Sequence, residues 1–192
     1  MKKLSMCVLL LVSLLLISAL AQAEPLPNRG GITWQSTIKG VMESEREIDP
    51  ENPPQHIELV TGKITSYVFR EHALLLGEKA DVLMYLFHNN ELVQIHYDFY
   101  EENGGPRYQA TLAKLKEMYG EPLSTDGTES NDISNMLAEM PDLYVPEMAQ
   151  GYHEWMIDAN TKLCIFYREN AFVISYTNYP WVLPYLHPGE GE

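Results

Sequence analysis

The chain has 192 residues, 45% of them hydrophobic, and its 27 acidic residues outnumber its 13 lysines and arginines, for a formal net charge of −14. This length and composition predict one globular domain, or two fused halves. The acidic excess makes nucleic acid and anionic membrane surfaces poor partners, so we expect neither as the ligand.

The first 23 residues are predicted to be a secretory signal peptide. Met1–Ala23 begins with a basic start, continues with an apolar run of about 13 residues and ends in a small-x-small cleavage site before Glu24. The apolar run is shorter than the ~20 residues of a membrane-spanning helix, so we expect no stable membrane insertion after cleavage. Loss of two lysines would take the net charge from −14 to −16. We expect a secreted protein, either periplasmic or extracellular.

The mature chain divides into four predicted segments. A flexible leader, 24–31, precedes a first α+β half, 32–105, and a second α+β half, 106–180, is followed by a C-terminal tail, 181–192. The boundaries follow the glycines and prolines that interrupt regular structure.

Two helices are predicted from apolar side chains at helical spacing. The first spans about 37–47, with Ser36 as its N-cap. The second spans 106–119, since Pro106 suits the first helical turn. Their buried stripes are expected to contain Ile38, Val41 and Met42, and Tyr108, Leu112, Leu115 and Tyr119. A short amphipathic helix over 133–140, inserted in the second half, would either cover the sheet or move as a flap.

Strand patterns occupy much of the remaining chain. After a proline-rich break at 49–55, strands are expected over 64–70 and 74–77. Two hairpins are predicted, one over 80–100 and one over 161–177. Helices combined with antiparallel hairpins define the α+β class.

The turn of the first hairpin determines which side chains share a face. Asn89 and Asn90 tolerate the left-handed backbone of a two-residue type I′ turn. Cross-strand partners should then have residue numbers that sum to 179, which places Val82 opposite Tyr97. The core face is expected to carry Val82, Met84, Leu86, Val93, Ile95 and Tyr97.

The opposite face of this hairpin is the predicted binding surface. Its aromatic and polar residues are Tyr85, Phe87, Gln94 and His96. Amphipathic rings are good anchors for a protein contact, and a soluble protein rarely leaves such a patch bare. We expect either that an exported partner protein binds here or that the C-terminal PWVLPYL segment lies over the face.

Sequence motifs of enzymes are absent. The chain has no nucleophile elbow, zinc-protease motif, phosphate-binding loop, paired-cysteine motif or EF-hand loop. We therefore expect a non-enzymatic binding module without a metal or cofactor. His96 and Asp98 would point to the same side of a strand, so a hydrolase or metal-dependent enzyme that uses them is the alternative. A structural component of the cell envelope is a second alternative.

Signal cleavage would leave Cys164 as the single cysteine, which excludes a disulfide within the mature monomer. Its neighbours Leu163 and Ile165 belong to a predicted strand. We therefore expect a buried structural thiol rather than a reactive one.

The two hairpins indicate an internal repeat. A shift of 79 residues lays Ala73–Tyr97 over Tyr152–Tyr176 without a gap. The expected core positions of the second hairpin are Leu163, Ile165, Phe172, Ile174 and Tyr176. We expect two helix-plus-antiparallel-meander halves that share one sheet, with the helices on one face.

The segments ITWQSTIKGVM and YQATLAKLKEMYGEP, with the two hairpins, resemble exported folds of the group that includes the β-lactamase inhibitor protein and the small outer-membrane lipoproteins (SmpA/OmlA). In that group helices cover one face of a sheet and the other face binds a partner protein. The resemblance therefore implies an exported, protein-binding α+β fold. The chain lacks the cysteine pairs of the inhibitor and the lipid-acceptor cysteine of the lipoproteins, so a β-lactamase target does not follow.

Overall fold

The computed structural model describes residues 29–48, 50–51, 55–61, 64–70, 73–123, 150–168 and 170–181. The predicted signal peptide, the short helix predicted over 133–140 and the tail from residue 182 onward lie outside these residues.

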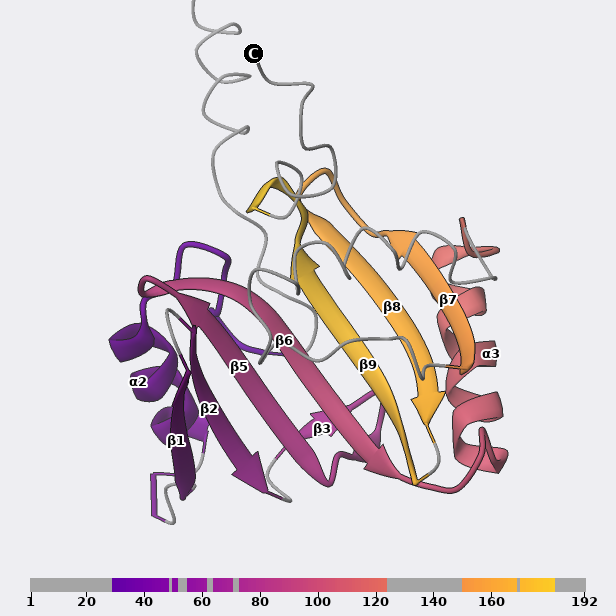
Figure 1. Cartoon of the computed structure of the whole chain (residues 1–192), viewed down its shortest axis with the longest axis horizontal. Coiled ribbons are helices and arrows are strands. Elements are labelled where there is room, and N and C mark those ends of the chain that lie inside the picture. Colours follow the sequence, from indigo (N-terminus) through magenta and orange to yellow (C-terminus); the bar gives the residue numbers. More distant parts are fainter. Residues whose placement is uncertain are drawn as a thin grey trace, which may run out of the picture.

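Seven strands form one antiparallel sheet with the order β1-β2-β5-β6-β9-β8-β7 (Figure 1). The strands are β1 (His56–Thr61), β2 (Ile64–Arg70), β5 (Val82–His88), β6 (Glu91–Tyr100), β7 (Gln150–Met156), β8 (Thr161–Arg168) and β9 (Ala171–Asn178). A separate two-stranded hairpin consists of β3 (Leu74–Leu75) and β4 (Glu78–Lys79). The fold is therefore α+β, as predicted.

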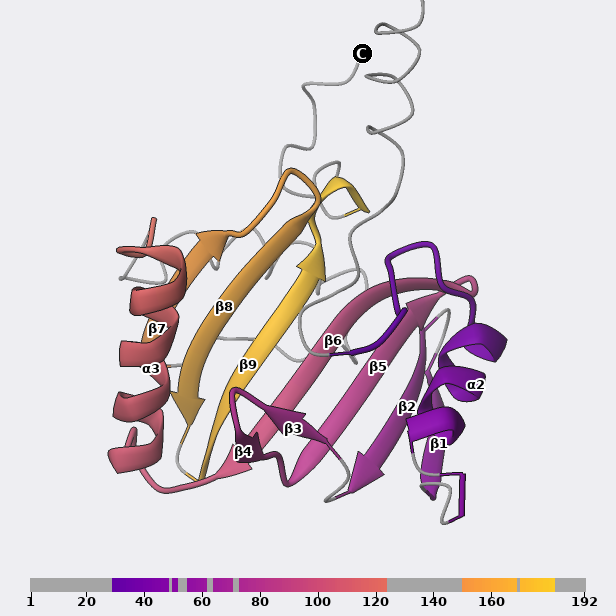
Figure 2. The ribbon, with the colours of Figure 1, turned by 180° about the vertical axis from the view of Figure 1, so that it is seen from behind.

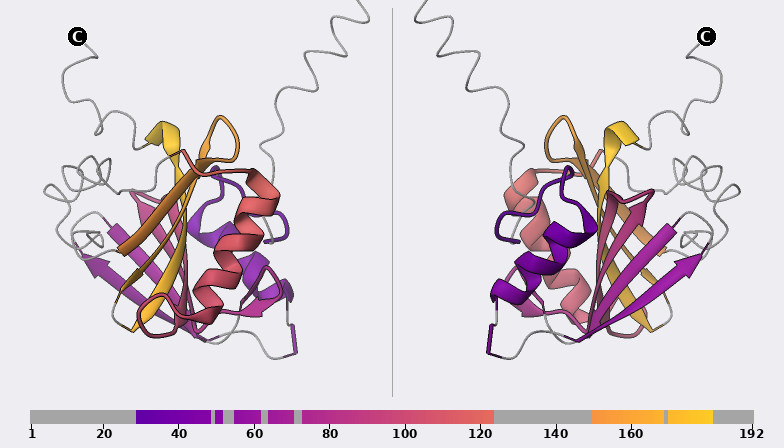
Figure 3. Two further views of the ribbon diagram at one scale, coloured as in Figure 1. Left: turned by 90° about the vertical axis from the view of Figure 1, so that its right-hand side faces the viewer. Right: turned by 90° about the vertical axis from the view of Figure 1, so that its left-hand side faces the viewer.

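Two helices, α2 (Ile38–Ile48) and α3 (Pro106–Tyr119), lie on the same face of the sheet as the β3-β4 hairpin (Figures 2 and 3). The bounds of α3 are those predicted from the sequence. Thr37, rather than the predicted Ser36, caps α2, because its Oγ1 accepts a hydrogen bond of 3.2 Å from the backbone N–H of Gly40. Ser36 instead accepts one of 2.9 Å from the N–H of Thr33. In the described residues, no helix has the length and apolar character needed to cross a membrane.

The main hydrophobic core lies between the helices and this face of the sheet. Val41 of α2 and Leu115 of α3 are fully buried in it. The strands contribute, among others, Phe69, Leu83, Tyr85, Phe87, Ile95, Tyr97, Leu163, Ile165, Phe172, Ile174 and Tyr176. The core positions predicted for the second hairpin are thus confirmed.

The first hairpin has the predicted two-residue turn but not the predicted register. Asn89 and Asn90 have φ angles of 50° and 69°, and His88 pairs with Glu91. A β-bulge then shifts the pairing by one residue, so that Val82 lies opposite Asp98 rather than Tyr97.

The bulge inverts the predicted faces of β5. Because one extra residue of β6 is accommodated, Tyr85 pairs with Ile95 and Leu83 with Tyr97, and these side chains point toward the helices. Tyr85 and Phe87 are both 0% exposed. The prediction that they lie on an accessible second face is wrong.

The predicted leader, 24–31, extends too far into the chain. Arg29 is buried, and its Nε donates hydrogen bonds to Glu45 Oε1 of α2 at 2.9 Å and to the hydroxyl of Tyr85 at 3.3 Å. The packed structure therefore begins no later than Arg29.

The strands β6 and β9 pair at the centre of the sheet, and His96 lies opposite Ser175, the position 79 residues further along. The predicted repeat offset superimposes the core faces of these two strands. The same offset fails for β5 and β8. It aligns Tyr85, which lies in the main core, with Cys164, which lies on the other face of the sheet. Duplication of one ancestral half stays a prediction.

Candidate binding cleft

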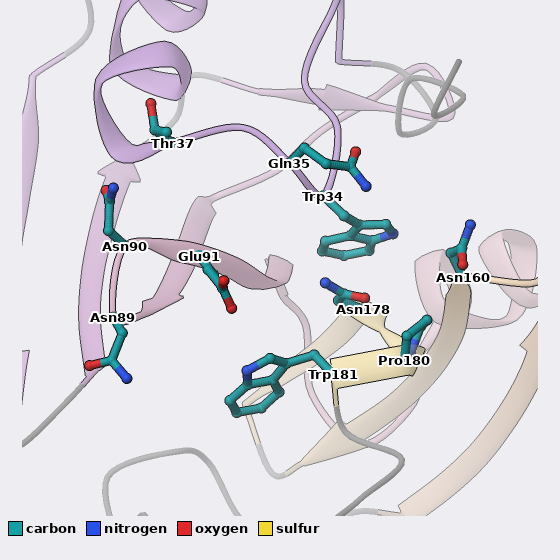
Figure 4. A pocket seen from close by; sticks show the side chains of 10 residues that line it. All are labelled: Trp34, Gln35, Thr37, Asn89, Asn90, Glu91, Asn160, Asn178, Pro180 and Trp181. Carbon is teal, nitrogen blue, oxygen red and sulfur yellow. The ribbon is translucent and has the colours of Figure 1, made fainter. Parts of the chain in front are cut away.

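A cleft of about 710 Å³ opens at the end of the sheet where the β5-β6 turn, the start of β8 and the end of β9 meet (Figure 4). Its lining residues are Trp34, Gln35, Thr37, Asn89, Asn90, Glu91, Asn160, Asn178, Pro180 and Trp181. We call it the Trp34–Trp181 cleft. This volume lies within the range of pockets that take small organic ligands.

Trp34 forms a fixed wall of the cleft. It is only 8% exposed, and its indole Nε1 donates a hydrogen bond of 2.9 Å to Oγ1 of Thr161, the first residue of β8. Trp181, just after β9, is partly buried and its ring lies 5.2 Å from that of His88, tilted by 57°. Figure 4 shows both indoles facing the same space, with Asn178 between them.

Two of the lining amides are held by the backbone of neighbouring elements. Asn90 Oδ1 accepts a hydrogen bond of 3.3 Å from the N–H of Ile38, the first residue of α2. Asn178 Nδ2 donates one of 3.5 Å to the carbonyl of Leu92. Each amide retains further donor or acceptor capacity, because an amide group has two donor hydrogens and two acceptor lone pairs.

Local backbone geometry explains why the asparagines converge. The positive φ angles of the type I′ turn are ones that asparagine tolerates well, so the turn presents Asn89 and Asn90 beside each other at the rim. Across the cleft, the N–H of Tyr179 donates a hydrogen bond of 2.8 Å to the carbonyl of Asn160. This contact places the segment after β9 beside the turn before β8.

The cleft carries little charge. Among its described lining residues, Glu91 is the one ionisable side chain, and it is exposed. The other polar groups are neutral amides and the hydroxyl of Thr37. Such a lining favours neutral, hydroxyl-rich or cationic ligands over anions.

The four residues predicted to form a binding surface do not come together. Tyr85 and Phe87 belong to the core beneath the helices. Gln94 and His96 lie on the other face of the sheet, each 7% exposed, and Gln94 Nε2 donates a hydrogen bond of 3.1 Å to Thr177 Oγ1.

His96 and Asp98 share that second face, as alternate residues of one strand do. The described residues contain no group of three or more His, Cys, Asp or Glu side chains that could hold a metal ion. A two-residue pair alone does not make a metal centre.

Cys164 also lies on the second face, in a small cluster with Tyr152, Phe166 and Val173. It is buried, as predicted. Burial raises the pKa of its thiol to about 12, so the unreactive protonated form prevails at neutral pH. Next to this cluster, Lys162 Nζ lies 2.7 Å from Glu154 Oε2 in a largely buried ion pair.

Another buried polar cluster joins Arg29, Glu45 and Tyr85. Their mutual hydrogen bonds include one from the Tyr85 hydroxyl to Glu45. Burial, followed by the charge of Glu45, raises the pKa of Tyr85 well above its usual range. Because these groups satisfy one another inside the core, we assign them a structural role.

No family model, curated protein or solved structure matches this chain. The architectural resemblance inferred from the sequence therefore stays a prediction.

Proposed function

We propose that the protein is an exported, non-enzymatic binding module whose ligand occupies the Trp34–Trp181 cleft. The observation that carries the proposal is the convergence of two indoles and five side-chain amides, from segments far apart in the sequence, on one cleft. Pockets that combine apolar walls with a few fixed polar groups are the usual sites for small ligands. The amide side chains are those of Gln35, Asn89, Asn90, Asn160 and Asn178.

Catalysis is the weaker interpretation of the same cleft. General acid–base chemistry usually needs two groups whose pKa values differ, for instance the paired carboxylates of glycosidases. Glu91 is the single carboxylate among the described lining residues. Binding needs no such pair.

Export is supported by the predicted signal peptide. Intact-mass analysis of protein recovered from the exported fraction should show a chain that begins at Glu24. A chain that retains Met1 and stays with the cells would contradict this part of the proposal.

The binding part can be tested by thermal unfolding of the mature protein with neutral, cationic and anionic small molecules. A ligand that binds the native state raises the melting temperature. We expect at least one compound to do so for the wild type and for Tyr100→Ala, but not for Trp181→Ala. Tyr100 is 56% exposed at the other end of β6, about 30 Å from Glu91, and is therefore a matched aromatic control. If every stabilising compound acts equally on Trp181→Ala, the ligand site lies elsewhere.

A further inference from the structure

We infer that the ligand of the Trp34–Trp181 cleft is a short neutral saccharide. This inference rests on the proposed function and specifies its ligand class.

The first argument is the pairing of aromatic and amide groups. A sugar ring has an apolar face of C–H groups and an edge of hydroxyls. The partly buried ring of Trp181 offers a flat apolar surface for the face. Each hydroxyl both donates and accepts a hydrogen bond, and a neutral amide side chain can do both in return.

The second argument is the charge of the lining. An acidic sugar or a phosphorylated ligand needs a cation, and the described lining residues include no lysine, arginine or histidine. The strongly acidic chain adds a general repulsion for anions. Glu91 can accept a hydrogen bond from a hydroxyl without requiring a charged partner.

The third argument is preorganisation. Thr161 holds Trp34, the first turn of α2 holds Asn90, and the carbonyl of Leu92 holds Asn178. Weakly attractive sugar contacts yield measurable affinity only where few side chains must be immobilised on binding. Three of the side chains that line the cleft meet this condition.

A quaternary ammonium ligand is the competing chemistry, since two tryptophans and one carboxylate can form a cage for a cation. It is less favoured for two reasons. Trp34 exposes only 8% of its surface, so little of its ring is available to pack against a cation. A quaternary ammonium group also has no N–H to donate, so it could not form hydrogen bonds with the five amides.

The test is isothermal titration calorimetry of the mature protein with N,N′-diacetylchitobiose, maltose, cellobiose, choline and glucuronate. We expect at least one neutral disaccharide to bind. Trp181→Ala should weaken that binding roughly tenfold or more, as truncation of an aromatic anchor does, and Asn160→Ala should weaken it less. Glu91→Gln should leave it within about threefold, because the amide still accepts a hydrogen bond. Tyr100→Ala should leave it unchanged.

The outcomes separate the two claims. Binding of choline that is lost in Glu91→Gln, without binding of any disaccharide, would overturn the saccharide assignment and leave the proposed binding function in place. Binding of a disaccharide that is unaffected by Trp181→Ala would overturn both, because the ligand would then lie outside the cleft. If none of the three disaccharides binds, the saccharide assignment alone is overturned.

Discussion

The indole N–H of Trp34 donates a hydrogen bond to the hydroxyl of Thr161, a residue 127 positions later in the chain. The bond joins the segment before α2 to the first residue of β8, and both side chains are buried. It therefore fixes one wall of the Trp34–Trp181 cleft.

Replacement of Thr161 by valine keeps the side-chain volume but leaves the indole N–H without its acceptor. A buried donor that loses its partner costs about 1–3 kcal/mol, so we expect Thr161→Val to lower the free energy of unfolding by that amount. Thr161→Ser retains the hydroxyl and should cost less. Urea denaturation followed by circular dichroism measures both values. Equal stability of the valine and serine variants would show that the hydrogen bond contributes nothing.

Removal of one partner of the buried ion pair between Arg29 and Glu45 should destabilise the protein far more than replacement of both partners by apolar residues. Its side chains are only 5% and 1% exposed. Removal of one partner leaves the other charge unpaired in the core. We therefore expect Arg29→Met or Glu45→Leu alone to lower the free energy of unfolding by about 3–5 kcal/mol.

The double variant Arg29→Met with Glu45→Leu removes both charges and should recover most of that loss. The Tyr85 hydroxyl would then lose its acceptor, so the same three variants are also made in a Tyr85→Phe background. Chemical denaturation of both sets measures the coupling between the two charges with and without the phenol. Additive losses in the double variant would contradict a coupled pair.

The helices could be predicted from the sequence because helical spacing identifies the buried face directly. Tyr108 and Leu115 of α3 are buried as their spacing requires. In a strand the period is two, so a single inserted residue exchanges the two faces. Nothing in the run of residues after Asn90 marks the β-bulge, and strand periodicity alone therefore assigns Tyr85 to the wrong side.

The strand β1 could not be predicted from the sequence, for a different reason. It follows a proline-rich stretch and lies at the edge of the sheet, where Ile57, Leu59 and Val60 are all at least half exposed. The alternation of polar and apolar residues over His56–Leu59 is short, and Val60 interrupts it. The cleft could not be predicted either, because Trp34, Asn90, Asn160 and Trp181 become neighbours only through the pairing of distant strands.

Cys164 should resist modification in the native protein. Burial holds its pKa at about 12, and the attacking species is the thiolate. An alkylating reagent at neutral pH should therefore react slowly with native protein and rapidly after denaturation, as mass spectrometry can follow. Cys164→Ala should cost on the order of 1 kcal/mol of stability. Rapid labelling of native protein would contradict the buried position.

Stability should decline at alkaline pH because several phenols are buried. Burial is the main cause that raises the pKa of Tyr85, Tyr97, Tyr108 and Tyr176 above the ordinary value of about 10. Above that pH the unfolded chain loses phenol protons that the folded chain retains. The folded state thus binds more protons, and the free energy of unfolding falls as pH rises.

Tyr176→Phe isolates one of these phenols. Within the described residues, the Tyr176 hydroxyl is buried and has no hydrogen-bond partner. Its removal should therefore raise stability at pH 7, by up to about 1 kcal/mol, because a buried polar group without a partner is eliminated. Above pH 10 the variant should lose stability less steeply than the wild type, by up to about 1.4 kcal/mol per pH unit. Denaturation series at several pH values, with Tyr85→Phe for comparison, measure this slope. Parallel slopes for wild type and Tyr176→Phe would mean that the Tyr176 phenol ionises as readily in the folded protein as in the unfolded chain.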